Sequence, residues 1–291
     1  MTTESMSALL TALRVIGYAG FVLWAGPLIF WSLVGPAGQR HRRLVRLSGV
    51  GAVLLVLTSV AEPALRLTAG GQTLDEVAPP LAGAAVLLRL AILVASLFYL
   101  TDLVAGTVVG TRRAVALGSI VLVATTMALQ PTVLGQPSPV LAAFGTAGHL
   151  LATAAWLGGL VALASVVRPG AQAGEAGGLV TRFSPVATLG LLLLVAASTL
   201  TVLAAAAGRA GLGGGGGGGS GLVLRLALLG ALLVVAGYAH RVTARLAFRR
   251  LFSPAAATGP ARERAVTSVV GTQLAIAFGA LSAAMLVCLT A

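Results

Sequence analysis

"LAAFGTAGHLLATAAWLGGLVALASV", residues 141–166, runs through the middle of the chain without a charged side chain. A helix of about 20 apolar residues crosses a bilayer core about 30 Å thick, and this stretch is long enough to do so. The whole chain is similar: 58% of its 291 residues are hydrophobic, 9% are charged, and the mean hydropathy is +1.01. This composition excludes an ordinary water-soluble domain and predicts a helical membrane protein.

Eight apolar runs of this kind follow one another along the sequence. We expect transmembrane helices at residues 9–34, 47–68, 80–104, 113–131, 141–166, 183–207, 221–240 and 266–289. Only short polar or glycine-rich connections separate them. The sequence therefore predicts an all-α, polytopic bundle of eight helices that forms one membrane domain over residues 1–291.

The basic residues indicate how the bundle is oriented. All 19 are Arg, and most lie in the connections after the first, third, fifth and seventh runs, whereas the alternate connections are rich in Gly and Pro. Because Arg-rich loops stay in the cytoplasm, we expect both termini outside. The net charge of +12 is thus interpreted as an orientation signal, and no nucleic-acid partner is expected.

Several short motifs recur along the chain. They are "WAGPLIF" from Trp24 and "WLGGLVA" from Trp156, "RLSGVGAVLLV" from Arg46 and "RFSPVATLGLL" from Arg182, "LLRLAIL" around Arg89 and "VLRLALL" around Arg225, and "RAV" at Arg113 and Arg264. They predict two parallel four-helix repeats, 9–131 and 141–289, related by an axis along the membrane normal. The alternative is chance similarity among helices rich in Ala and Leu.

Three stretches in the second half resemble a known family. "HLLATAAWLGGLVAL" (149–163), "RFSPVATLGLLLLV" (182–195) and "SGLVLRLALLGALLVVAGYAHR" (220–241), in this order, are similar to the membrane domain of the copper resistance protein D (CopD) family. The resemblance covers roughly residues 141–250. It implies a multi-pass protein of the bacterial plasma membrane that handles or imports copper, with a periplasmic or extracellular copper-binding protein as a candidate partner.

Copper(I) prefers thioether, thiolate and imidazole ligands, and such donors gather in the expected outer half of the bundle. We predict a copper site drawn from His149, Met127, Met285 and Cys288. The alternative is that each sulfur side chain fills the core and that a neutral His149 bonds to a neighbouring helix. A haem group is not expected, because no two His residues share one depth.

Charged residues in the same half are also compatible with a function that does not involve copper. Because the positive field of several Arg repels a cation, we expect either that Arg89 and Arg225 reach lipid phosphates or that one of them pairs with Glu62. Otherwise the bundle binds an anion or a lipid headgroup, or acts as a membrane scaffold that transports nothing. No catalytic triad, carboxylate pair or nucleotide motif occurs in the sequence, so we expect no enzyme.

Overall fold

The computed structural model describes residues 3–35, 42–69, 73–77, 79–105, 110–136, 138–166 and 173–210, and within these ranges it contains helices and no strand. Five helical stretches are long and apolar enough to cross a membrane. They are Glu4–Leu33, Arg42–Thr68, Pro80–Phe98, Pro139–Val166 and Arg182–Thr201. The chain is therefore an all-helical, multi-pass membrane protein in its described part.

The longer helices of the described part overlap the first six expected spans. In chain order the elements are α1 (Thr3–Leu33), α2 (Arg42–Thr68), α3 (Leu74–Val77), α4 (Pro80–Ala105), α5 (Thr111–Ala128), α6 (Pro131–Leu134), α7 (Pro139–Thr153), η1 (Ala154–Gly158), α8 (Gly159–Val166) and α9 (Ala173–Ala210). The short helices α3 and α6 lie in the connections between the spans. The expected fourth span falls on α5, which begins with two Arg in its first turn and is not among the five most apolar stretches. The expected spans 221–240 and 266–289 lie outside the described residues.

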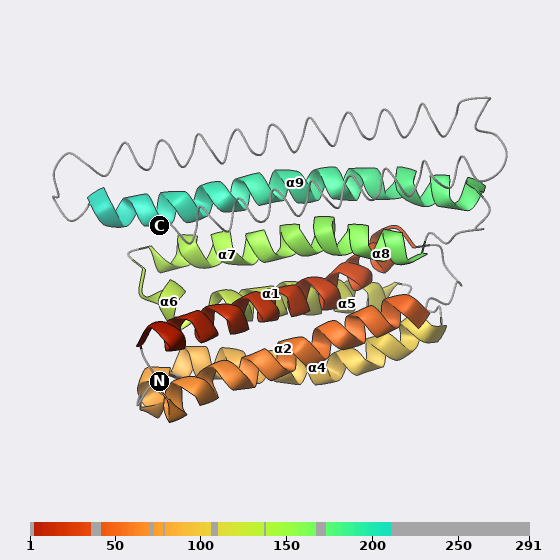
Figure 1. The fold of residues 1–291 in the computed structure, drawn as a ribbon. Coiled ribbons are helices and arrows are strands. Elements are labelled where there is room, and N and C mark those ends of the chain that lie inside the picture. The colour runs from red at the N-terminus through yellow and green to blue at the C-terminus, as the bar shows by residue number, and fades with distance from the viewer. Residues whose placement is uncertain are drawn as a thin grey trace.

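The long helices lie side by side along one direction, with α1 in the middle (Figure 1). Helix α1 contacts α2, α5, α7, η1, α8 and α9. Its second half is consequently the centre of the core, where Phe21, Trp24 and Phe30 are fully buried. Helices α1 and α7 run in the same direction (Figure 1), and the two parallel four-helix repeats stay a prediction.

Glycines allow the backbones around α1 to approach closely. A Cβ atom added at Gly158 of η1 would lie 2.7 Å from the Cα atom of Gly26 in α1, and a Cβ at Gly26 would meet the Gly158 backbone in turn. On the other side of α1, a Cβ at Gly51 of α2 would lie 2.6 Å from the Gly20 carbonyl oxygen. Small residues allow such close packing in membrane bundles. Close packing matters there because lipid is as apolar as the side chains, so the hydrophobic effect does not drive the helices together.

Hydrogen bonds around Trp24 hold the first helices together. The Trp24 indole donates from Nε1 to the Ser96 hydroxyl of α4 at 3.2 Å, and the Ser48 hydroxyl of α2 donates to the Trp24 carbonyl oxygen at 3.0 Å. All three side chains are buried. The core of the first half is thus fixed by packing and by polar contacts that have no competing water.

Candidate functional site

His149 lies in α7, in the half of the bundle that the topology prediction assigns to the outside. It is half-buried, and the Thr153 hydroxyl one turn later donates a hydrogen bond of 2.8 Å to the His149 carbonyl oxygen. Within the described ranges the imidazole itself has no hydrogen-bond partner. The alternative expectation, an imidazole bonded to a neighbouring helix, finds no support in this part of the chain.

The segment after His149 departs from the regular α-helix expected over 141–166. Residues Ala154–Gly158 form a π-helical turn, η1, between α7 and α8. Such turns add one residue to a helical turn and are frequent at functional sites. Trp156 lies in this turn, is buried, and has no hydrogen-bond partner for Nε1 among the described residues. The same turn carries Gly158, which contacts α1 at Gly26.

The soft donors predicted beside His149 are only partly within the described structure. Met127 lies in α5, is 3% exposed, and packs in the hydrophobic core. Because α5 packs against α7, the fold brings the helices of Met127 and His149 together, while a contact between the two side chains stays a prediction. Met285 and Cys288 lie outside the described residues. The described ranges hold no group of three or more His, Cys, Asp or Glu side chains that could bind a metal ion.

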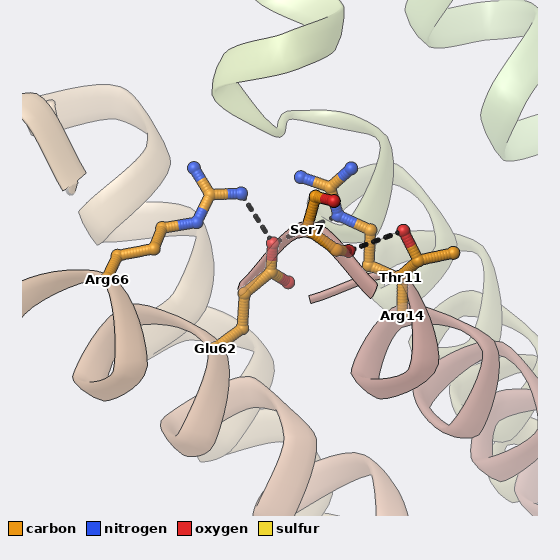
Figure 2. A network of polar contacts seen from close by, with 5 residues as sticks. All are labelled: Ser7, Thr11, Arg14, Glu62 and Arg66. Atoms are coloured by element: carbon orange, nitrogen blue, oxygen red, sulfur yellow. Dashed lines mark hydrogen bonds and ion pairs between the residues drawn. The ribbon is translucent and has the colours of Figure 1, made fainter. Parts of the chain in front are cut away.

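Charged side chains of α1, α2 and α4 gather in one half of the bundle. Figure 2 shows Glu62 of α2 between two guanidinium groups: its carboxylate accepts from Arg14 Nε of α1 at 3.0 Å and from Arg66 Nη2 of α2 at 2.7 Å. The side chains of Arg66, Glu62 and Arg14 are 15%, 21% and 29% exposed. The Arg66 Nε atom is fully buried and has no hydrogen-bond partner among the described residues.

Arg89 of α4 is held more deeply than Arg14 and Arg66. It is 6% exposed, and its Nη2 donates to the Thr126 carbonyl oxygen of α5 at 2.7 Å. Its Nη1 donates to the Ser59 hydroxyl of α2 at 3.2 Å, and its Nε to the Thr126 hydroxyl at 3.3 Å. Arg89 therefore does not extend to the lipid surface, and within the described residues its hydrogen bonds go to neutral groups.

Both expectations for Arg89, a lipid phosphate or a direct ion pair with Glu62, differ from this arrangement. The Glu62 carboxylate is occupied by Arg14 and Arg66, and it interacts with Arg89 electrostatically at longer range. Arg225, the other residue of the expected pair, lies outside the described residues.

Tyr18 of α1 lies beside these charges and near Gln130, a residue of the connection between α5 and α6. Its hydroxyl interacts electrostatically with Arg14, Glu62 and Arg89 and lies near the Gln130 side chain. We call Arg14, Glu62, Arg66 and Arg89 the arginine cluster.

The four charges of the cluster were identifiable in the sequence, whereas their polar neighbours were missed: Ser59, Thr126, Tyr18 and Gln130. The only signal of these neighbours was a polar residue near the outer end of an apolar run, which by itself does not specify a partner.

We compared the chain with known proteins, and no protein-family model, characterised protein or solved structure matches it. The likeness to the CopD family rests on the three sequence stretches alone. The two features that the structure adds are the half-buried His149 beside a π-helical turn and the arginine cluster.

Proposed function

We propose that the chain is a copper-handling protein of the bacterial plasma membrane that imports copper ions. The single observation that carries the proposal is His149: a half-buried imidazole without a hydrogen-bond partner in the described ranges, followed one turn later by a π-helical segment. An ionisable group at membrane depth is costly and is commonly functional. A neutral imidazole also has a free nitrogen lone pair, which is a ligand for copper(I).

A duplicated architecture would provide the path for the ion, and the packing of α1 supports it. Trp24 and Trp156, like Gly26 and Gly158, are 132 positions apart in the sequence, and the two glycines touch. Contact between equivalent residues is expected where two repeats meet at their symmetry axis.

The helix that follows in each half also packs at equivalent places on the first, although the two packing glycines are 139 positions apart and not 136, the offset of Arg46 and Arg182. Gly51 of α2 packs on the backbone of Trp24 and Gly20, and Gly190 of α9 packs on Trp156 and Ala152. Gly20 and Ala152 are again 132 positions apart.

Copper accumulation in cells tests the role of His149. We expect His149→Ala to reduce accumulation to about the level of cells without the protein, because the only imidazole in the proposed site is lost. Thr146→Ala is the matched control, since Thr146 is also half-buried on α7 and its hydroxyl bonds within that helix, to Ala142. Metal content is measured by mass spectrometry at equal amounts of membrane-inserted protein.

Two results would contradict the proposal. Unchanged accumulation in His149→Ala removes His149 from the mechanism. Accumulation that is the same with and without the wild-type protein removes copper transport, and co-purification of a stoichiometric partner would then favour a scaffold.

A further inference from the structure

We propose that the arginine cluster is a binding site for a phosphate group. The site lies between α1, α2 and α4, and the inference is independent of copper handling because it uses none of the proposed copper ligands. The ligand chemistry is a phosphate oxyanion, supplied either by the headgroup of an anionic lipid or by soluble phosphate.

The charge balance of the cluster is the first argument. Three guanidinium groups and one carboxylate leave a surplus of two positive charges among the side chains that the structure describes, where Glu62 is the acidic residue paired with them. An uncompensated charge within a bilayer costs several kcal/mol, so buried charges there are normally paired. A bound phosphate carrying one to two negative charges would supply the missing counter-charge.

The geometry of the donors is the second argument. The Arg66 Nε atom is buried and lacks a partner in the described structure, and Arg89 donates to neutral oxygens of Ser59 and Thr126. A guanidinium group carries more N–H donors than these bonds use. Its planar fork matches two oxygens of a phosphate, which a neutral hydroxyl cannot replace.

The gradient of exposure is the third argument. Arg89 is almost completely buried, whereas the side chains of Arg66 and Arg14 are 15% and 29% exposed. The cluster thus leads from the end of α2 inward to α4, and an anion arriving at the headgroup level reaches Arg14 and Arg66 before Arg89. Glu62 separates the two outer guanidinium groups and competes with the ligand for them (Figure 2).

The test uses the full-length protein in nanodiscs of phosphatidylcholine, with thermal unfolding followed by tryptophan fluorescence. Inorganic phosphate is titrated in one arm, and in the other the phosphatidylcholine is replaced stepwise by phosphatidylglycerol. We expect one probe to raise the unfolding midpoint of the wild type. Arg66→Gln should weaken the apparent affinity about tenfold, the effect of one lost charge-assisted hydrogen bond. Arg42→Gln, an exposed position at the opposite end of α2, should leave it unchanged.

Glu62→Gln keeps the test decisive if Arg66→Gln folds poorly. This change removes the competing carboxylate and frees Arg14 and Arg66, so it should strengthen binding of the same probe, which a folding defect cannot do. A response to phosphatidylglycerol alone assigns the site to lipid, and a response to inorganic phosphate alone assigns it to a soluble anion. If neither probe shifts the wild-type midpoint, or if Glu62→Gln and Arg66→Gln change the affinity in the same direction, the proposal is wrong.

Discussion

Replacing Glu62 by Gln should lower the free energy of unfolding in phosphatidylcholine nanodiscs by about 2–3 kcal/mol, because it leaves partly buried guanidinium groups without their counter-charge. Glu62 forms two ion pairs through one carboxylate, at 3.0 Å from Arg14 and 2.7 Å from Arg66. Removing one partner of a fully buried pair costs more than this, and the 21% exposure of Glu62 reduces the loss. The electrostatic support of Arg89 by Glu62 disappears at the same time.

Denaturation in sodium dodecyl sulfate, monitored by the fluorescence of the three tryptophans, provides the measurement, because all three are buried in the fold. Glu4→Gln is the control, since Glu4 is exposed in the first turn of α1, and its effect should stay within about 0.5 kcal/mol. A Glu62→Gln variant as stable as Glu4→Gln would mean that the arginine cluster contributes no stability through its ion pairs.

Much of the helical architecture was predictable from apolar run length, and the exceptions have physical causes. The runs at 47–68 and 80–104 match α2 and α4 within a few residues, because a bilayer demands internally bonded helices of a fixed length. The π-helical turn at Ala154–Gly158 was not predictable in the same way. Hydrophobicity does not distinguish a π turn from an α turn, and run length does not specify the close packing of Gly158 of this turn against α1.

For the candidate site, the charges could be found in the sequence but their partners could not. Glu62 and Arg89 are conspicuous because ionisable residues are rare in apolar runs. That Glu62 bonds to Arg14 rather than to Arg89 depends on how α1 and α4 pack against α2, which run length does not specify. His149 was also predicted because ionisable residues are rare in apolar runs. Its distance to any sulfur atom depends on how the helices pack, which the sequence does not specify.

Gly26→Ala should destabilise the protein by about 1–3 kcal/mol, the usual cost of overpacking a closely packed contact. The added Cβ would meet the Cα, carbonyl carbon and carbonyl oxygen of Gly158, so no side-chain rotation can relieve the clash. Helix α1 and η1 would have to separate, although α1 is central to the core. In contrast, Gly49→Ala in α2 meets nothing within 4 Å and should be neutral or stabilising by up to about 1 kcal/mol, because Ala favours the helix.

The double variant Gly26→Ala with Gly158→Ala distinguishes a specific contact from a general loss of packing. Each single change separates the same two backbones, so once one Cβ has forced α1 and η1 apart, the second meets less resistance. We therefore expect the double variant to be more stable than the sum of the two losses predicts, by about 0.5–3 kcal/mol, as for residues in direct contact. Strictly additive losses in the same denaturation assay would mean that the two glycines act at independent places, and the tight crossing of the two tryptophan-containing motifs would lose its support.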